Sequence, residues 1–293
     1  VYKRQVGNGT GTISTMSGGS QTINVGTGTV STMINGSQNV NRNATGTIDI
    51  ISGGMQSVGP NGNGIINTMS NGNQNIIAGT GTVSTMISGE QNILGGGTGT
   101  VSTMSGGSQN IEDGSGIIDV MISGEQNITS GAGTVIAMNS GVQYISGGTG
   151  IISTMVDGVQ FIYSGGKGTI DVMNSGAQFI YSGTGTVDTM SGGSQTIVSG
   201  AAGTINTMHD GMQAISSGCT GTVSAMNGGT QAVNSGGTAL DTVIAGGTQL
   251  VSGGAVISGA TLSAGVQQVY DGTNLNNITF AGGTQAVMSG AAV

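Results

Sequence analysis

The chain is poor in the residues on which much of the chemistry of small domains depends. Its 293 residues include one Cys, one Pro, one His and no Trp, and only four residues are Lys or Arg. A single Cys excludes a disulfide framework and any metal site built from several thiolates. Four cations cannot form the basic surface that binding to nucleic acid requires. No apolar run approaches the ~20 residues of a membrane helix.

Glycine is abundant instead, with 61 residues. Collagen is excluded because it needs Gly at every third position and many Pro residues. Disorder is excluded because 35% of the chain is hydrophobic and only 5% is charged. The formal net charge is -8, and three of the four cations, Lys3, Arg4 and Arg42, lie near the N-terminus. The composition therefore predicts an ordered chain whose body is almost free of positive charge.

Nearly the whole chain repeats one phrase, GTVSTMSGGSQNI, as it stands at Gly99–Ile111. Successive Gln residues of the phrase are always 17 or 18 residues apart. A fixed period of this size is typical of stacked repeat architectures. The sixteen copies are marked by Gln21, Gln38, Gln56, Gln74, Gln91, Gln109, Gln126, Gln143, Gln160, Gln178, Gln195, Gln213, Gln231, Gln249, Gln267 and Gln285.

Aligning the copies on this Gln shows which positions form turns and which form strands. The position two before the Gln is Gly in all sixteen copies, and the position two after it is always Ile or Val. Gly favours tight turns, and β-branched residues in short runs between turns favour strands. Side chains alternate along a strand, so Gln109 and Ile111 share one face while Ser108 and Asn110 share the other. The variable composition of the second face indicates that the Gln–Ile face is the buried one.

These features predict an all-β fold, a single-stranded parallel β-solenoid of about 16 coils with 17–18 residues per coil. The usual hand of parallel crossovers favours a right-handed β-helix. Stacked coils place equivalent residues ~4.8 Å apart, so the buried Gln amides can bond to one another as an internal ladder. Strict alternation from Val101 would place Met104 on the outer face. Because soluble proteins rarely expose so long an apolar stripe, we expect a bend that turns the Met column inward.

The repeat divides the chain into three segments. Residues 1–6 fall outside the repeat, and we expect them to be a non-native head. Residues 7–235 carry the regular coils, and residues 236–293 carry variant repeats that continue the same solenoid. The chain has no signal peptide, does not begin with Met and stops in the middle of a repeat, so we expect a fragment of a longer protein.

The variant segment resembles the AIDA-type repeats of bacterial autotransporter passengers. The resemblance rests on GGTQLVSGG at Gly246–Gly254 and AGGTQAVMSG at Ala281–Gly290, and more loosely on SGGMQSV and SGEQNI earlier in the chain. It implies a β-helix at the bacterial cell surface that takes part in adhesion or aggregation and that is sometimes O-glycosylated on Ser and Thr.

One group of aromatic residues is the candidate binding site. Five of the eight aromatic residues recur in three consecutive copies at positions with outward parity: Tyr144, Phe161, Tyr163, Phe179 and Tyr181. They are expected to form one patch on a surface of small polar residues, and aromatic side chains are favoured at binding sites for proteins and sugars. Two other interpretations remain: rings that only stiffen the sheet by stacking, or an edge that a missing domain covers.

The remaining candidates for chemistry are weaker, and we predict no catalytic residue, no metal site and no cofactor. His209 beside Asp210 reads as a variant of a surface turn. Four Asp residues share an outward position seven before the Gln: Asp49, Asp119, Asp171 and Asp188. They are expected to form a solvated face, with a cation shared by Asp171 and Asp188 of adjacent copies as the alternative. An external Asn ladder is expected from Asn75, Asn92, Asn110 and Asn127, which share one outward position in successive copies.

The functional prediction is a non-enzymatic adhesive repeat protein, a passenger fragment of a bacterial surface adhesin. Its expected partner is a protein or glycan on a host or neighbouring cell, with self-association through open strand edges as a further expectation; no nucleic acid and no membrane insertion are expected. One alternative is an ice-binding solenoid that uses the Thr-Gly-Thr ranks, which begin at Thr10, Thr27, Thr45, Thr80, Thr98, Thr184 and Thr220. A second alternative is a fragment of a polysaccharide-degrading β-helix enzyme. The absence of long insertions argues against this enzyme, because a cleft needs them.

Overall fold

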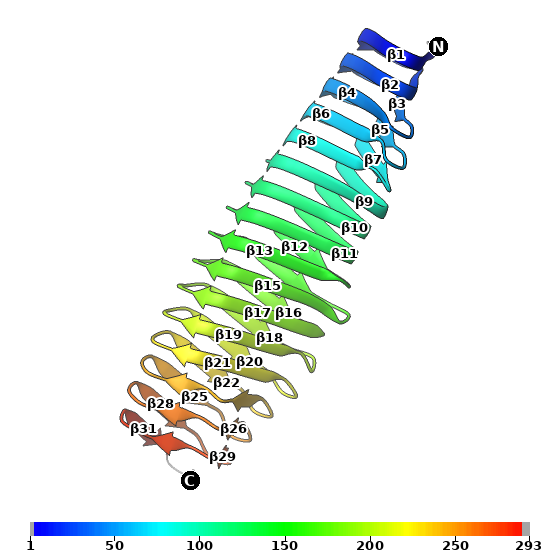
Figure 1. Cartoon of the computed structure of the whole chain (residues 1–293). Coiled ribbons are helices and arrows are strands. Elements are labelled where there is room, and N and C mark those ends of the chain that lie inside the picture. Colours follow the sequence, from blue (N-terminus) through cyan, green and yellow to red (C-terminus); the bar gives the residue numbers. More distant parts are fainter. Residues whose placement is uncertain (1–2, 289–293) are drawn as a thin grey trace. The chain divides into compact units, whose positions relative to one another are not determined.

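The computed structural model describes residues 3–288, which contain 31 strands and no helix. They form two compact units, one ending at Gln143 and the other beginning at Tyr144, and each unit holds eight of the sixteen repeat Gln residues. The strands within each unit are parallel, and successive coils stack on one another (Figure 1). The predicted parallel β-solenoid is therefore confirmed. Residues 1–2 of the expected head and residues 289–293 of the variant segment lie outside the described residues.

The first unit contains two kinds of strand, which alternate along the chain. A Gln strand carries the Gln and the following Ile or Val, and a Met strand carries the Val and the Met. In five places a Gln strand continues without a break into the following Met strand, which gives one strand of 14 or 15 residues: β1, β2, β9, β10 and β11. The strands are β1 (Lys3–Met16), β2 (Ser20–Met33), β3 (Ser37–Val40), β4 (Ala44–Ile51), β5 (Met55–Val58), β6 (Asn63–Met69), β7 (Asn73–Ile77), β8 (Thr80–Met86), β9 (Glu90–Met104), β10 (Ser108–Met121) and β11 (Glu125–Met138).

The first strand begins within the segment that the sequence places outside the repeat. β1 starts at Lys3 and pairs in register with β2, with Arg4 opposite Gln21 and Val6 opposite Ile23. The Val6 side chain is buried, and the Arg4 guanidinium donates from Nη1 to the carbonyl oxygen of Thr12 at 2.7 Å. Residues 3–6 thus occupy the positions of a Gln strand.

The second unit separates the two kinds of strand in every regular coil. β12 (Val142–Ile145) contains the residue at which the units divide. The regular strands are β13 (Thr149–Met155), β14 (Val159–Ile162), β15 (Gly166–Met173), β16 (Ala177–Ile180), β17 (Gly183–Met190), β18 (Ser194–Ile197), β19 (Ala202–Met208), β20 (Met212–Ile215), β21 (Thr220–Met226) and β22 (Thr230–Val233).

The variant segment of this unit builds coils of three short strands. These are β23 (Thr238–Leu240), β24 (Val243–Ile244), β25 (Thr248–Val251), β26 (Val256–Ser258), β27 (Thr261–Leu262), β28 (Val266–Val269), β29 (Asn274–Asn276), β30 (Thr279–Phe280) and β31 (Thr284–Val287). Both β23 and β24 pair with the single Met strand β21. The extra corner lies at Asp241, whose φ of 47° is left-handed, and Gly259 has a φ of 74° at the same place in the next coil.

The predicted Gln ladder runs through the core of each unit. In the first unit, each amide from Gln38 to Gln143 donates from Nε2 to Oε1 of the preceding Gln at 2.6–2.8 Å. The second unit repeats the bond from Gln178 to Gln285 over the same range. All Gln residues of the ladder except Gln285 are fully buried. Every described buried side-chain nitrogen or oxygen has a hydrogen-bond partner, so the polar core leaves no such group unsatisfied.

The regular coils have Gly at two recurring positions, and each position requires Gly for a different physical reason. The Gly two before each Gln has a positive φ in all sixteen coils, between 70° and 112°. A side chain there would also meet the preceding coil, since a Cβ on Gly107 would lie 2.5 Å from the carbonyl oxygen of Gly89. The central Gly of the Thr-Gly-Thr sequence instead leaves room for the side chains of the Gln and Ile in the same coil. A Cβ on Gly99 would lie 2.5 Å from Ile93 Cδ1 and 2.6 Å from Gln91 Oε1.

The Met column lies inside, as expected. Along the Met strands, two outward residues follow each other between the buried Val and the buried Met, as at Ser102 and Thr103 between Val101 and Met104. This break in alternation is the bend, and it leaves Met104 with no exposed surface. The core of a regular coil therefore consists of Val, Met, Gln and Ile, with small residues at the corners.

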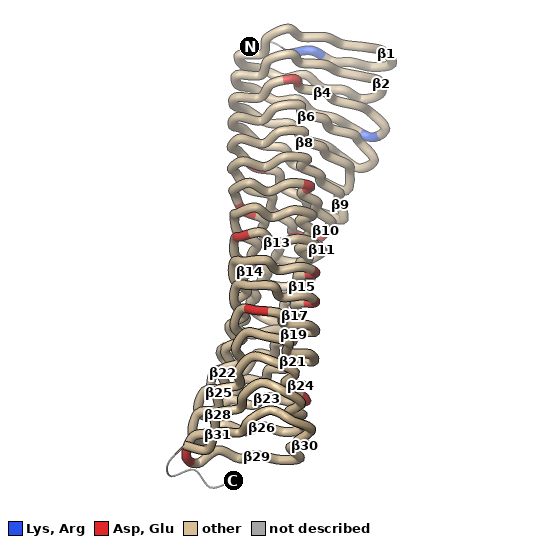
Figure 2. The backbone as a smooth tube through the Cα atoms, turned by 90° about the vertical axis from the view of Figure 1, so that its left-hand side faces the viewer, with Lys and Arg blue, Asp and Glu red and all other residues tan. Residues whose placement is uncertain are grey.

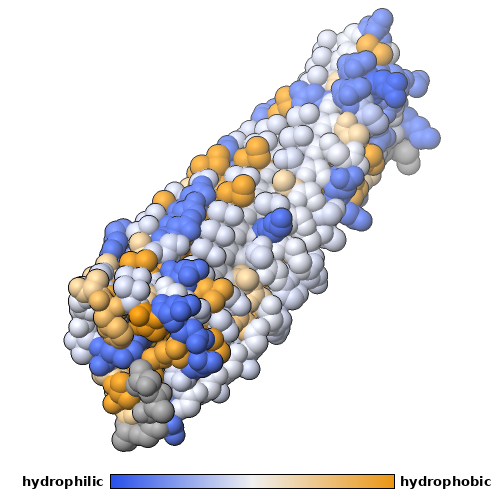
Figure 3. Space-filling model, turned by 60° about the horizontal axis from the view of Figure 1, so that its bottom comes forward, coloured by the Kyte–Doolittle hydropathy of each residue, from blue (hydrophilic) through white to orange (hydrophobic). Residues whose placement is uncertain are grey.

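The outer surface is small, polar and sparsely charged. Acidic positions occur singly or in small groups along the backbone, as at Glu112 and Asp113, and basic ones are fewer (Figure 2). Most of the face seen in Figure 3 has intermediate hydropathy, and hydrophobic residues gather at the end nearest the viewer. Among the residues at the C-terminal end, Phe280 is 56% exposed and Val287 is 45% exposed. None of residues 3–288 lies in a helix of the length and hydropathy that a membrane span requires.

Candidate binding surface

The five predicted aromatic residues lie together on the outer face of the second unit. Phe161 follows the buried Gln160 in β14, and Phe179 follows the buried Gln178 in β16. The two strands pair in parallel with Phe161 directly opposite Phe179. Because Gln and Ile point inward at alternate positions, the intervening aromatic side chain points outward. The parity of the repeat thus sets the direction of these rings.

The rings form a ladder of stacked pairs. Tyr144 stacks on Phe161 with ring centroids 5.3 Å apart and an interplanar angle of 11°, and Phe161 stacks on Phe179 at 5.3 Å and 18°. A second row places Tyr163 against Tyr181 at 4.9 Å and 8°. Phe161 joins the rows, at 6.1 Å from Tyr163 and 6.3 Å from Tyr181. We call these five residues the aromatic ladder. Its spacing follows the ~4.8 Å distance between neighbouring strands.

The ladder is partly withdrawn from water. Tyr181 is 36% exposed and the other four rings are half-buried. Burial raises the pKa of the Tyr163 phenol, and the neighbouring phenols of Tyr181 and Tyr144 raise it further. The phenol of Tyr163 therefore keeps its proton to a higher pH than a free tyrosine, and it stays a neutral hydrogen-bond donor over the physiological range.

Stacking limits what the aromatic ladder can offer to a partner. Phe161 has a ring on each face, so its outer edge is left for contact, whereas each ring at the end of a row keeps one face that no other ring covers. The phenol groups of the three Tyr residues are also left for contact. No charged residue occurs in β14, β16 or β18. Such a surface suits a neutral partner with both apolar and hydroxyl groups. The same stacking is also what the stiffening interpretation expects, so the structural and the binding interpretations both stay predictions.

The predicted Asn ladder is present in the first unit. Asn92 donates from Nδ2 to Asn75 Oδ1 at 2.9 Å, and Asn110 and Asn127 continue the row at 2.8 and 2.9 Å. It occupies the position after the Gln, the same position that Phe161 and Phe179 hold in the second unit. The row satisfies its own amides and therefore needs no ligand.

The other residues weighed for chemistry lie in turns or on the outer side of strands, and of these Asp171 and Asp188 are neighbours in the paired strands β15 and β17. His209 and Asp210 are exposed in a turn, where Asp210 Oδ1 accepts the backbone N–H of Gly211 at 2.7 Å. Asp49 and Asp188 each accept from an Asn of the next coil, Asn67 at 2.9 Å and Asn206 at 2.7 Å. Within residues 3–288 no three His, Cys, Asp or Glu side chains gather as metal ligands would.

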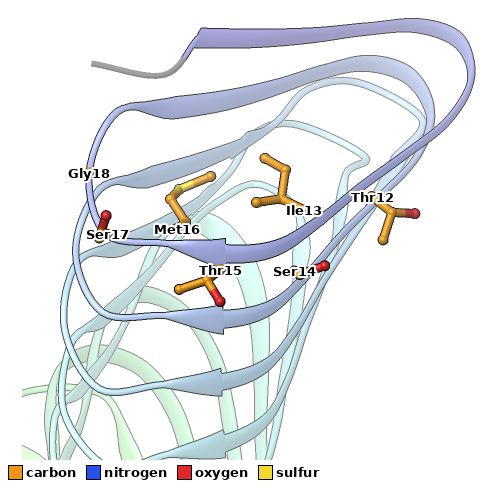
Figure 4. A pocket seen from close by; sticks show the side chains of 7 residues that line it. All are labelled: Thr12, Ile13, Ser14, Thr15, Met16, Ser17 and Gly18. Carbon is orange, nitrogen blue, oxygen red and sulfur yellow. The ribbon is translucent and has the colours of Figure 1, made fainter.

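Several hollows lie in the first unit, and sequence reasoning pointed to none of them. A hollow of about 400 Å³ lies against residues 12–18, where Ile13 and Met16 point toward the coil interior (Figure 4). None of its lining residues titrates. A polar groove of about 550 Å³ runs over the turns before the Gln strands of four coils, and Glu90, Ser108 and Glu125 line it. The sequence signal for it is Glu in place of a small residue directly before Gln91 and Gln126.

No protein-family model matches the chain, and no curated protein matches it. Among solved structures, the crystal structure of the TibC-catalysed hyper-glycosylated TibA 55–350 fragment is similar to it. The two share 23% sequence identity with a TM-score of 0.48, over 99% of this chain and 98% of that fragment. The resemblance of the repeats to AIDA-type passenger repeats rests on the sequence motifs.

Proposed function

We propose that the chain is a non-catalytic adhesive protein of the bacterial cell surface, a passenger segment that holds contact surfaces on stacked coils. The observation that carries the proposal is the aromatic ladder, which is the one place where the repeat exchanges small polar outward residues for five rings. The resemblance to AIDA-type repeats supports assigning the chain to the extracellular adhesive proteins.

The proposed partner is a protein or glycan on a host or neighbouring cell. Aromatic and tyrosyl side chains provide apolar area together with hydroxyl groups, which suits sugars and neutral protein surfaces. Acidic partners are not expected, because a chain with four cations and a net charge of -8 offers them no electrostatic attraction.

The test compares two variants that change the same repeat position in the two units. In the first, Phe161→Thr and Phe179→Thr are combined, since Thr196 holds this position in the next coil. In the matched control, Asn92→Ser and Asn110→Ser are combined in the Asn ladder. Beads coated with each purified protein are scored for attachment to cells and for self-aggregation, and far-UV circular dichroism confirms folding. We expect the Phe variant to lose attachment and the Asn variant to keep it. Full attachment by a folded Phe variant would remove the aromatic ladder from the proposal.

The Thr ranks support a second candidate, ice binding. Thr10, Thr27 and Thr45 lie opposite one another in register, and Thr12, Thr29 and Thr47 form a second row beside them. Regular hydroxyl rows on a flat sheet are the feature that this function needs. A thermal-hysteresis assay on the purified chain tests it, and the absence of ice shaping removes this candidate while leaving the adhesive one standing.

A further inference from the structure

In two of the sixteen coils, the turn before the Gln strand contains an Asn followed directly by the Gly that lies two residues before the Gln. Its apex, three residues before the Gln, is Asn35 in one coil and Asn71 in another, and each is exposed and followed by the turn Gly. In both, the Gly backbone N–H donates to the Asn Oδ1, at 2.8 Å for Gly36 and 2.9 Å for Gly72.

The backbone amides on either side of this Gly donate to carbonyl oxygens of the preceding coil. Asn35 N–H donates to the carbonyl oxygen of Met16 at 3.3 Å, and Ser37 N–H donates to that of Gly19 at 3.0 Å. The amide of Gly36 instead faces the side chain of Asn35, and no Cβ shields it. The backbone nitrogen and the side-chain carbonyl are therefore held together without any ladder bond that must first open.

We propose that Asn35 and Asn71 are sites of spontaneous deamidation in the folded protein. The Gly backbone nitrogen attacks Cγ of the Asn and forms a new N–Cγ bond. The Cγ–Nδ2 bond breaks, and ammonia leaves with the proton that the backbone nitrogen gives up. Water then opens the resulting five-membered imide at either carbonyl, giving aspartate or isoaspartate. No oxidant or reductant takes part.

The repeat already contains the aspartate product at the same apex. Asp157 accepts the N–H of Gly158 at 2.8 Å, and Asp210 accepts that of Gly211 at 2.7 Å. The turn thus accommodates an Asp with the same capping bond. Isoaspartate is different, because it carries the chain through the side-chain carbon and lengthens the turn by one backbone atom. That extra atom works against the close approach of turn Gly36 to Gly19, where a Cβ would already lie 2.8 Å from the carbonyl oxygen.

Other Asn-Gly pairs provide internal controls. Gly62, after Asn61, donates its N–H to the carbonyl oxygen of Gly59 at 2.9 Å. Gly228, after Asn227, donates to that of Met208 at 3.3 Å. Each of these amides must leave a backbone bond before it can attack, and local opening limits such a reaction.

The experiment incubates the purified full chain in mildly alkaline buffer and follows each Asn-Gly peptide by mass spectrometry. A parallel sample is unfolded in urea. We expect Asn35 and Asn71 to deamidate more than about ten-fold faster than Asn61 and Asn227 in the folded chain, and the difference to vanish in urea. Equal rates in the folded chain would overturn the proposal. A difference that persists in urea would also overturn it, because the local sequence and not the fold would then set the rate.

A second measurement tests the consequence for the fold. The aspartate and isoaspartate products are separated by ion exchange and heated while circular dichroism is recorded. We expect the aspartate form, and the variant carrying Asn35→Asp and Asn71→Asp, to unfold at the temperature of the parent, and the isoaspartate form to unfold earlier. An aspartate form that unfolds as early as the isoaspartate form would contradict the equivalence with Asp157 and Asp210.

Discussion

Replacing one ladder amide with a hydrocarbon of similar size measures what the polar core contributes. Gln109 lies in the middle of the first unit, where its Nε2 donates to Gln91 Oε1 at 2.7 Å and its Oε1 accepts from Gln126 Nε2 at 2.7 Å. Nε2 also lies 3.3 Å from the carbonyl oxygens of Gly99 and Ile117. The variant Gln109→Leu removes these bonds and leaves little empty volume.

The expected loss follows from the two neighbouring Gln side chains, which stay buried and lose their bonds to Gln109. Gln91 Oε1 loses its donor from Gln109, and a buried group deprived of its bond costs about 1–3 kcal/mol. Gln126 Nε2 loses its short bond but keeps the carbonyl oxygens of Gly116 and Thr134, both at 3.4 Å, so its cost lies at the low end. Together they predict a free energy of unfolding lower by about 2–4 kcal/mol.

Urea unfolding followed by far-UV circular dichroism measures this loss. The control is Ser108→Ala, the outward neighbour of Gln109, which is expected to change the free energy of unfolding by about 0.5 kcal/mol or less. A Gln109→Leu variant as stable as the parent would refute the reasoning, since the ladder would then be replaceable by ordinary apolar packing.

Three further predictions address other parts of the coil. Gly107→Ala places a side chain at a φ of 82° and a Cβ 2.5 Å from the carbonyl oxygen of Gly89, so thermal unfolding should show a loss of at least about 1–3 kcal/mol; unchanged stability would contradict this. Met104→Ala should cost about 2–5 kcal/mol in urea unfolding because the side chain is fully buried, whereas an exposed Met would cost almost nothing. The raised pKa of Tyr163 means that the unfolded chain loses this proton first as the pH rises above the ordinary value of 10.0, so folding stability should fall from there upward. Ultraviolet titration of a Tyr163→Phe variant should lack a late-ionising tyrosine, and loss of an early one would contradict the assignment.

Much of the regular coil could be predicted because each of its columns has a local cause. The Gly before each Gln, the buried Gln with the following Ile or Val, and the outward parity of Phe161 and Phe179 follow from turn chemistry and alternation. The ladder of Gln91, Gln109 and Gln126 follows from placing equal residues ~4.8 Å apart. The inward Met104 needed one further argument, that a long apolar stripe is rarely left in water.

Other features could not be predicted because contacts across the coil set them. Gly99 is required by the side chains of Gln91 and Ile93, which lie earlier in the same strand β9 and come close to it across the coil; alternation of side chains does not show this contact. The three-stranded variant coils depend on left-handed backbone at Asp241, a residue type that also occurs in strands elsewhere in the chain. The polar groove beside Glu90 and Glu125 could not be predicted because it is formed by turns from coils that are two repeats apart in the sequence.

Disulfide trapping tests the in-register parallel stack most directly. Asn92 and Asn110 lie opposite each other in neighbouring coils, and their amides bond at 2.8 Å. Parallel neighbours ~4.8 Å apart satisfy disulfide geometry, whereas residues one strand over and two along are ~8 Å apart and do not. The buried Cys219 is far along the chain from both sites. Mild oxidation should therefore cross-link the pair Asn92→Cys and Asn110→Cys and leave the pair Asn92→Cys and Glu112→Cys reduced. Cross-linking of the second pair in preference to the first would contradict the account.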